Sequence, residues 1–549
     1  MSNPVFYTHC SRNKNNIYHT YIDSDGNKHH SVVRNFPYEL FIEGKKEDSK
    51  SLDGKKLQRY VFDSISEMND FVKKMKDVTD VYGNTNPVYQ FIAGTYPNDI
   101  VFDITKFTIF NFDIECRVGE NYVYDDSHIV ATHDDKKISL SECRANQDII
   151  VWDTEAEKDL PYLKSCYTKK TSAGFPEPHK AEQMVTAITC KVFGDNEKNY
   201  IFGLKEYKTK SEKDIYIKCN TEQELLVKFL SYYQKVKPDI LTGWNISGFD
   251  ILYLYNRINK IVGNDWGNRL SPYYKTCSGS PITVKEVHDK ENVFDVDIVG
   301  VSIFDYLELY KKFCPNKQES YRLDFISTEE IGYGKLDYSD FDGLEDLYNR
   351  DFERYIDYNI KDTLLVEELD KKLKYILLAL TIVYMGKTKL SDVFGQIMTW
   401  DCLIYNELKK ENIQIPPQKR RESNTSIIGG YVKDPEPKRY DWVVSFDLTS
   451  LYPSIIMSWN MSPETITHPA TGLHMDKMIG FNMPTQHIID NNETLAANGA
   501  RFTKAFHGIL PRLMSKTFSQ RKKYKDMMKE ESKTLELIKT EMQKRNIVY

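Results

Sequence analysis

The chain has 549 residues, a formal net charge of −6 and 40% hydrophobic residues. This length exceeds what one hydrophobic core supports, so we expect about three or four domains, and the composition excludes a disordered protein. No apolar run is long enough to cross a bilayer, and the polar start MSNPVFYTHC does not have the pattern of a signal peptide. We therefore expect an intracellular protein with no membrane partner.

The charge and the cysteines exclude little else. Acidic metal sites can offset basic grooves within one enzyme, so a negative net charge does not exclude a nucleic-acid partner. The nine cysteines lie far apart, with no CxxC pair. This spacing favours reduced thiols over a zinc site or a disulfide framework.

The elements change character along the chain. Residues 1–107 alternate short strand-like runs with turns and include one helical stretch, SISEMNDFVKKMKDV, which predicts a small α+β domain. From residue 108 longer strands alternate with helices, as in an α/β sheet, apart from a polar insertion over about 117–173. A helical pattern extends over about 350–412, and a proline-rich stretch near 415–440 marks a domain boundary.

The stretch TIFNFDIEC predicts a strand that carries two acids on one face. With a period of two, Phe110, Phe112 and Ile114 point to one side, and Asp113 and Glu115 point to the other. An Asp-x-Glu pair is also common on solvated strands. The apolar flanks favour a buried strand instead, where paired acids are costly unless a cation is present.

Two further elements contribute acids. In PDILTGWNISGFDILYLYNRI a strand ends at Gly243 and Asp250 opens a helix, although an acid at that position also suits the helix dipole. In RYIDYNIKDTLLVEEL, Tyr358 and Asp362 lie four residues apart and so share a helical face. Neither element alone is enough to predict a metal site.

Together these elements predict a metal-dependent phosphodiesterase. Four acids from three separate elements can converge on two Mg²⁺ ions, with Mn²⁺ as a possible substitute, and Tyr358 could orient the attacking water or contact the phosphate. The order of the elements resembles that of the DEDDy 3′→5′ exonucleases. This resemblance implies an RNase H-like fold for roughly residues 108–375.

A separate carboxylate, Asp447, lies in WVVSFDLTSLYPSII. The alternation of apolar residues predicts a half-buried strand that ends near Asp447, followed by a helix with Pro453 in its first turn. The intervening residues would present backbone N–H groups to a triphosphate. The alternative is that Asp447 only caps the helix and Tyr452 is a core aromatic residue.

The stretch DLTSLYPSII resembles motif A of the family B DNA polymerases. The upstream IIGGYVKDPEP resembles the Tyr-Gly-Gly region of that family, although here Gly429 and Gly430 precede Tyr431. Longer sequence stretches are similar to stretches in the replicative polymerases of T-even-like bacteriophages, and they include FPEPHKAEQ, LTGWNISGFDILYLYNRI and LDFISTEEIG. The resemblance covers nearly the whole chain apart from the insertion.

The resemblance implies roles for individual residues at both sites. It implies that the two Mg²⁺ ions of the exonuclease are held by Asp113, Glu115, Asp250 and Asp362, and those of the polymerase by Asp447 and the carbonyl of Leu448. It further implies that the incoming dNTP contacts Ser450, Leu451 and Tyr452. Tyr452 would also exclude ribonucleotides, because its ring leaves no room for a 2′-OH.

The last segment of the chain predicts a charged amphipathic helix. Arg521 and Lys525 lie four residues apart and share one face of it. Such residues usually form a solvated basic face. The resemblance instead implies that they lie on the fingers helix, where both would bind the triphosphate.

Two motifs that the family uses after this point, K-x-x-x-N-S-x-Y-G and D-T-D-S, are absent from the sequence. We therefore expect the second polymerase carboxylate to come from another polypeptide. Either the polymerase is naturally split, with a C-terminal subunit that carries motifs B and C, or this sequence is a piece of a longer chain; we favour the split. The other implied partners are primer–template DNA and, through the second subunit, a sliding clamp, in the cytoplasm of an infected bacterium.

We predict a multidomain α/β and α+β protein. Its expected parts are an α+β N-terminal domain at 1–107, joined by helices at about 375–418, an exonuclease domain at 108–374, a partial palm at 419–507 and the first part of helical fingers at 508–549. The alternatives are a stand-alone 3′→5′ exonuclease and a regulatory protein that binds nucleic acid.

Overall fold

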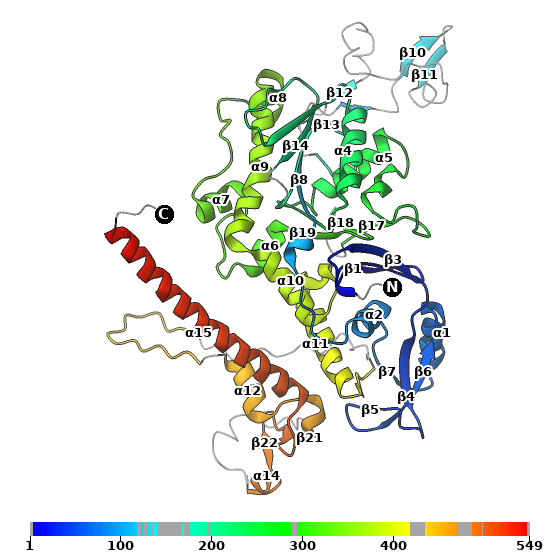
Figure 1. The fold of residues 1–549 in the computed structure, drawn as a ribbon, viewed down its shortest axis with the longest axis vertical. Helices are drawn as coiled ribbons and strands as arrows, with labels where there is room; N and C mark the ends of the chain where they lie inside the picture. The colour runs from blue at the N-terminus through cyan, green and yellow to red at the C-terminus, as the bar shows by residue number, and fades with distance from the viewer. Residues whose placement is uncertain are drawn as a thin grey trace. The chain divides into compact units, whose positions relative to one another are not determined.

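In the computed structural model, whose ribbon is drawn in Figure 1, the chain forms two compact units. Unit 1 comprises residues 1–34 and 92–399, and unit 2 comprises residues 35–91 and 400–549. The structure describes residues 4–117, 122–124, 129–133, 136–139, 167–169, 176–194, 198–287, 294–417, 434–448, 450–469, 486–496 and 498–545. Most of the predicted insertion, and the Tyr431 region, lie outside these residues.

Unit 1 is built on a mixed sheet of six strands, in the order β15-β14-β13-β8-β16-β19. β13 is antiparallel to both of its neighbours, and the other pairs are parallel. The bounds are β8 Ile109–Cys116, β13 Val185–Val192, β14 Asn199–Gly203, β15 Asp214–Lys218, β16 Ile240–Gly243 and β19 Ser302–Asp305. The predicted strands at 109–116 and 240–243 are confirmed.

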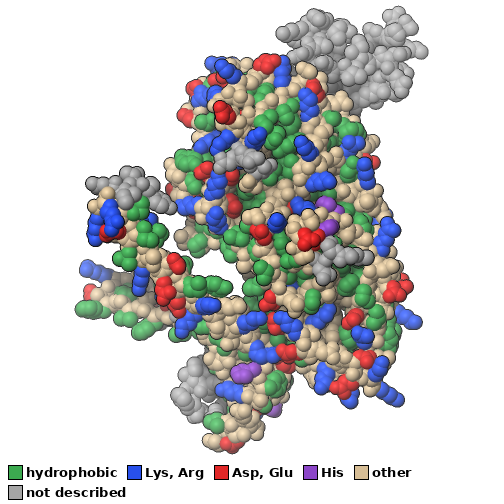
Figure 2. Space-filling view, in the orientation of Figure 1, with side chains coloured by type: hydrophobic (Ala, Val, Ile, Leu, Met, Phe, Trp, Pro, Cys, Tyr) green, Lys and Arg blue, Asp and Glu red, His purple; other side chains and the backbone are tan. Residues whose placement is uncertain are grey.

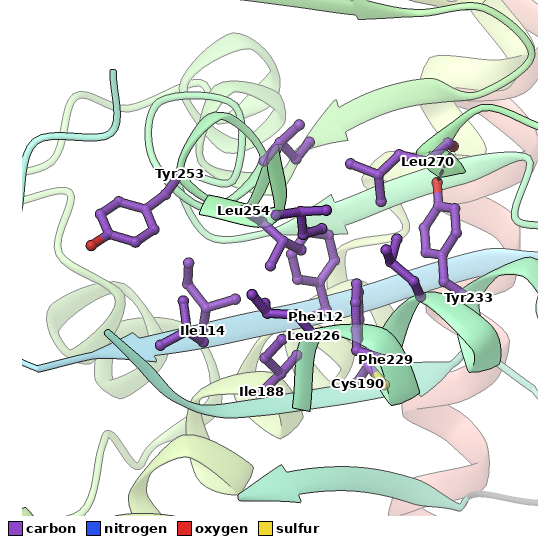
Figure 3. Close-up of a cluster of buried hydrophobic side chains, with 14 of the residues drawn as sticks. Phe112, Ile114, Ile188, Cys190, Leu226, Phe229, Tyr233, Tyr253, Leu254 and Leu270 are labelled. Atoms are coloured by element: carbon purple, nitrogen blue, oxygen red, sulfur yellow. Dashed lines mark hydrogen bonds between the residues drawn. The ribbon is translucent and has the colours of Figure 1, made fainter. Parts of the chain in front are cut away.

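Helices cover both faces of this sheet (Figure 1). On one face, Phe112 and Ile114 of β8 pack with Leu226 and Phe229 of α4 (Glu222–Val236) and with Leu254 of α5 (Asp250–Ile261), as Figure 3 shows. The other face of the sheet packs against α9 (Phe352–Leu373). The alternation predicted for β8 therefore separates an apolar face from the face that meets α9.

The first residues of the chain form a three-stranded antiparallel meander, which is hydrogen-bonded to the residue before β16 of this sheet. Its strands are β1 (Pro4–Asn13), β2 (Asn16–Asp23) and β3 (Lys28–Val33). The carboxylate of Asp239, just before β16, accepts hydrogen bonds from Thr8 Oγ1 at 2.7 Å and from Lys28 Nζ at 2.5 Å. Both ends of this contact are in unit 1.

Unit 1 also contains helices, a hairpin and short strands outside this sheet. The helices are α6 Tyr306–Phe313, α7 Leu323–Ile331, α8 Leu344–Arg350 and α10 Tyr375–Gly386. A hairpin joins β17 Ile282–Glu286 to β18 Phe294–Ile298. Short strands, paired as β9 with β12 and β10 with β11, are β9 Tyr122–Tyr124, β10 Ile129–His133, β11 Lys136–Ser139 and β12 Tyr167–Lys169. The 3₁₀ helices within the described part of unit 1 include η1 Ile104–Lys106, η4 Trp266–Leu270 and η5 Leu390–Phe394.

The described residues of unit 2 form two smaller sheets. The first has the order β20-β5-β6-β4-β7, and its strands are β4 Tyr38–Glu43, β5 Ser49–Ser51, β6 Lys56–Phe62, β7 Val81–Tyr82 and β20 Ile413–Gln414. The second has the order β21-β23-β22, with β21 Ile466–His468, β22 Glu493–Leu495 and β23 Arg501–Thr503. β20 pairs in parallel with β5, although the two are far apart in the chain.

The helices of unit 2 include the long terminal helix that the sequence predicts. They are α1 Ile65–Met75, α12 Leu451–Trp459, α14 Gln486–Asp490 and α15 Ile509–Lys544, with the 3₁₀ helix η6 at Pro463–Thr465. α2 (Pro87–Thr95) and α11 (Gln396–Lys410) each run across a boundary between the units. No helix among the described residues is both long and apolar enough to span a bilayer.

The surface carries charges of both signs. Figure 2 shows acidic and basic side chains interspersed over the visible face. The net charge of −6 therefore does not mean a uniformly acidic surface. The seven cysteines that the structure describes are free thiols.

Candidate active site

Three acids meet where β8 faces α9. Asp113 and Glu115 project from β8, and Asp362 projects from α9. Each offers a carboxylate oxygen, and these oxygens all lie within 4.8 Å of one another. The period-two pattern of β8 and the helical position of Asp362 thus bring together acids that are widely separated in the sequence.

Asp250, the fourth predicted acid, reaches the same strand from α5. Its Oδ1 accepts the N–H of Ile114, which lies between Asp113 and Glu115, at 3.1 Å. The preceding strand β16 ends at Gly243, where a Cβ would lie 2.8 Å from the Phe112 carbonyl oxygen. This close approach requires glycine, because a backbone carbonyl cannot move aside as a flexible side chain can.

The loop between β16 and α5 is held by a buried carboxylate that we did not predict. Asp305 accepts hydrogen bonds from the N–H groups of Asn245 at 3.1 Å and Ser247 at 3.0 Å. It also caps α6 through the N–H of Leu307 at 3.0 Å. These bonds fix the loop that presents Asp250.

Tyr358 and Asp362 share one face of α9, as predicted, and both contact Lys335. Lys335 Nζ donates to Asp362 Oδ2 at 2.5 Å and to the Tyr358 hydroxyl at 2.9 Å. Lys335 lies 27 residues before Asp362, in the turn after α7. The backbone N–H of Lys335 donates to Asp324 Oδ1 at 2.7 Å, which anchors this turn.

Burial and mutual repulsion disfavour the ionised forms of these acids. Burial, with the nearby Asp362 charge, raises the pKa of Asp113 to about 7. Burial and the charge of Asp113 raise the pKa values of Glu115 and Asp250 well above their usual range. The pKa of Asp362 is also raised by burial, although the Lys335 ammonium opposes the shift.

Lys335 is held in its charged form. Burial alone would lower its pKa, but the Asp362 carboxylate and the Tyr358 hydroxyl raise the pKa above its ordinary value. One ammonium thus faces several buried acids. The site carries more potential negative charge than the protein's own cation neutralises.

The residues fit a site for divalent cations. The donors are carboxylate oxygens, which Mg²⁺ and Mn²⁺ accept. Asp362 Oδ1 is buried and, among the described residues, has no hydrogen-bond partner. Buried polar atoms are normally paired, so this oxygen is available to a cation.

Besides Asp305, sequence reasoning missed two side chains that contact the acids directly. Asn359 donates its amide N–H to Asp113 Oδ2 at 2.7 Å, and its position inside the YNIKD phrase could have suggested it. Lys335 had no such signal, because a single lysine in a glycine-rich turn is usually solvated. Its contact depends on how the chain folds back from α7 to α9.

The predicted strand before Asp447 is wrong. Residues 442–448 form no strand, and their side chains are exposed, with Trp442 at 93% and Phe446 at 90% exposure. A half-buried strand needs a neighbour with which to pair, and no described strand pairs with this segment. Asp447 and Leu448 are therefore exposed to solvent rather than set in a sheet.

The helix predicted after Asp447 is confirmed as α12, with Pro453 in its first turn. Ser450 precedes it with φ at 52°, in the left-handed region, and Leu451 and Tyr452 are exposed. Arg521 and Lys525 lie on the exposed part of α15. No hydrogen bond or ion pair between described residues joins either of them to Asp447, so this site is assembled less completely than the first.

Two family models match the chain. The model for the exonuclease domain of DNA polymerase family B matches residues 132–326, and the model for DNA polymerase family B matches residues 393–547. The first range includes Asp250, and the second includes Asp447.

Curated relatives agree with these matches. The chain is 31% identical to the DNA-directed DNA polymerase of Escherichia phage RB69, over 99% of this chain and 56% of that protein. It is 30% identical to that of Enterobacteria phage T4, over 97% of this chain and 55% of that protein. A DNA polymerase delta catalytic subunit from Dictyostelium discoideum matches at 28% identity, over 65% of this chain and 32% of that protein. The chain thus spans about half the length of the two phage relatives, and the matches to both family models show that it belongs to DNA polymerase family B.

Proposed function

We propose that the β8–α9 site is a 3′→5′ exonuclease that removes mispaired nucleotides from the end of a DNA primer. The observation that carries the proposal is the group of three carboxylates within 4.8 Å, formed by Asp113, Glu115 and Asp362. Asp250 supports it from the same strand. The mixed sheet around β8 and the family match are those expected for an RNase H-like domain, which we propose for residues 108–374.

Each residue has a proposed role. Asp113, Glu115, Asp250 and Asp362 would hold two Mg²⁺ ions, which Mn²⁺ could replace. Bound ions would supply a deprotonated water and stabilise the departing 3′ oxygen. The Tyr358 hydroxyl, held by Lys335, would orient that water or contact the scissile phosphate.

We further propose that the Asp447 region contributes half of a DNA polymerase site. Asp447 and the Leu448 carbonyl would bind metal, and the dNTP would contact Ser450, Leu451 and Tyr452, with Arg521 and Lys525 on its phosphates. Tyr452, which is 76% exposed, is open to a nucleotide and would reject ribonucleotides by steric clash. The second carboxylate would come from polypeptide outside these 549 residues.

The exposed apolar side chains of unit 2 support this second proposal. Trp442, Val443, Val444 and Phe446 are each at least 74% exposed, although such residues are normally buried in a sheet. A complementing segment with motifs B and C would supply strands to pair with them. That segment would be either the continuation of a longer chain or a separate C-terminal subunit.

We propose the remaining domains from the sequence patterns and the family resemblance described above. They are an N-terminal domain at 1–107, joined by helices at about 375–418, a partial palm at 419–507 and the first part of the fingers at 508–549. A sliding clamp would bind through the complementing segment. The protein would act in the cytoplasm of an infected bacterium.

The test uses a primer with a 3′ mismatch. We expect the purified chain to degrade it with Mg²⁺, and Asp113→Ala to slow the reaction by at least about a hundredfold. Nucleotide incorporation should require a fragment that carries the missing motifs, and Asp447→Ala should abolish it without slowing degradation.

The other outcomes distinguish the rival functions. Degradation with no incorporation, even when the fragment binds, would indicate a stand-alone exonuclease. DNA binding with neither reaction would indicate a regulatory protein. Incorporation by the 549-residue chain alone would contradict the proposal that a carboxylate is missing.

A further inference from the structure

Two buried asparagines connect β8 to α9. Asn111 Nδ2 donates to the Thr363 carbonyl oxygen at 2.7 Å, and Asn359 Nδ2 donates to Asp113 Oδ2, also at 2.7 Å. Both side chains are fully buried, and in both the Oδ1 atom has no hydrogen-bond partner among the described residues. Asn359 Nδ2 also lies 3.5 Å from the Asp113 backbone carbonyl oxygen. Both amides therefore donate to a backbone carbonyl, and of the two only Asn359 also donates to a carboxylate of the candidate site.

Among the described residues, the hydrogen bond to the Asp113 carboxylate comes from the Asn359 amide. The terminal torsion of an aspartate is soft, so its carboxylate rotates unless a partner holds it. Thr189, which is paired with Asp113 across the sheet, makes no hydrogen bond through Oγ1 that the described residues reveal. Asn359 provides the hydrogen bond that the structure gives to this carboxylate.

We infer that Asn359 is a positioning residue for the metal site, which it serves by turning the Asp113 carboxylate toward Glu115 and Asp362. The bond occupies Oδ2, so the other oxygen of Asp113 is left to a cation. Hydrogen-bond partners that orient ligands in this way commonly change metal affinity or activity about 10- to 100-fold when they are removed. The inference rests on the exonuclease function proposed above.

The chain offers a matched control for the test. Asn359→Leu and Asn111→Leu remove the same donor at the same burial and keep a similar side-chain volume. Asn359→Ser and Asn111→Ser form a second pair in case a leucine prevents folding. For each protein we would measure thermal unfolding, Mn²⁺ affinity by electron paramagnetic resonance, and kcat and KM on the mismatched primer.

We expect the Asn359 variants to bind Mn²⁺ about 10- to 100-fold more weakly, with a lower kcat, an unchanged KM for DNA and partial rescue by excess Mn²⁺. The Asn111 variants should lose similar thermal stability but stay within about threefold of the wild-type affinity. Equal losses of affinity in both pairs, or unchanged affinity in the Asn359 variants, would overturn the inference.

The test of Asn359 can fail independently of the test of the proposed exonuclease function. A wild-type chain that binds Mn²⁺ but does not degrade the primer would contradict the exonuclease proposal. The four affinities would still decide the role of Asn359, because they are measured without DNA.

Discussion

The acids of the β8–α9 site and Asp447 have opposite surroundings. Asp113, Asp250 and Asp362 each receive a hydrogen bond from elsewhere in unit 1, namely from Asn359, from the Ile114 backbone and from Lys335. Asp447 is exposed, in a segment without secondary structure. A carboxylate site needs neighbours that orient it, and the described chain supplies these for one site only.

The largest expected effect is on the free energy of unfolding, and it is tested by replacing one phenylalanine in each region. Phe112, 3% exposed, packs behind the acids, so Phe112→Ala should lower the free energy of unfolding of unit 1 by about 3–5 kcal/mol. Phe446→Ala should change stability by less than about 0.5 kcal/mol, because Phe446 is 90% exposed. Hydrogen exchange followed separately in each unit would measure both.

The same two variants also test whether the exposed segment of unit 2 binds the complementing fragment. Phe446→Ala should weaken binding of the complementing fragment, whereas Phe112→Ala should not, provided that unit 1 is still folded. If Phe446→Ala binds the fragment normally, the exposed segment is not the contact surface.

The next effect is stabilisation by a metal. Mn²⁺ at about a hundred times its dissociation constant should stabilise unit 1 by about 2.7 kcal/mol, because only the folded site binds it tightly. Thermal unfolding with Mn²⁺ and with EDTA would measure this. Asp447→Asn should keep the full stabilisation and Asp113→Asn should lose most of it; equal responses in the two variants would remove the distinction between the regions.

The last effect, which is smaller than the others when it is given per pH unit, is a pH dependence in EDTA. Asp113 has a pKa of about 7 in the folded chain, above its ordinary value of 3.8, so the folded state binds the proton more readily. Protonation of this group should therefore stabilise the fold as the pH falls from about 7 to 4, by at most about 1.4 kcal/mol per pH unit. Urea unfolding of wild type and Asp113→Asn over this range would give the difference.

This comparison needs the variant because buried histidines act in the opposite direction. Burial lowers the pKa values of His9 and His19 to about 3, so the unfolded chain takes up their protons first. Their effect lowers stability as the pH falls from about 6.5 toward 3, and it is common to both proteins. Identical pH profiles for wild type and Asp113→Asn would mean that Asp113 does not titrate near pH 7.

Local patterns predicted the elements of unit 1 well. The period of two in β8 gave the correct face for Asp113 and Glu115, and helical spacing gave the shared face of Tyr358 and Asp362. These patterns succeed because the side-chain direction within one element depends only on its own backbone geometry. The resemblance to the family then supplied the order in which the elements meet.

Local patterns failed where a contact depends on distant residues. The alternation at 443–448 is as regular as that of β8, but the segment has no described strand beside it and does not form one. Lys335 gave no sign of its role, because its contact with Asp362 exists only after the turn beyond α7 folds onto α9. Spacing along the chain could indicate neither outcome.

The parallel pairing of β20 with β5 has a consequence for synthesis on the ribosome. β5 is made early, but its partner at Ile413–Gln414 emerges only after residues 92–399 of the other unit, which at typical rates takes roughly 15 to 60 s. During that interval the edge of β5 is unpaired, a condition in which strands associate with other chains. The nascent protein must therefore keep this edge covered or charged until the later segment arrives. Lys50 and Lys56, which neighbour each other on β5 and β6 and form ion pairs with Glu47, are the charged groups that would discourage such association.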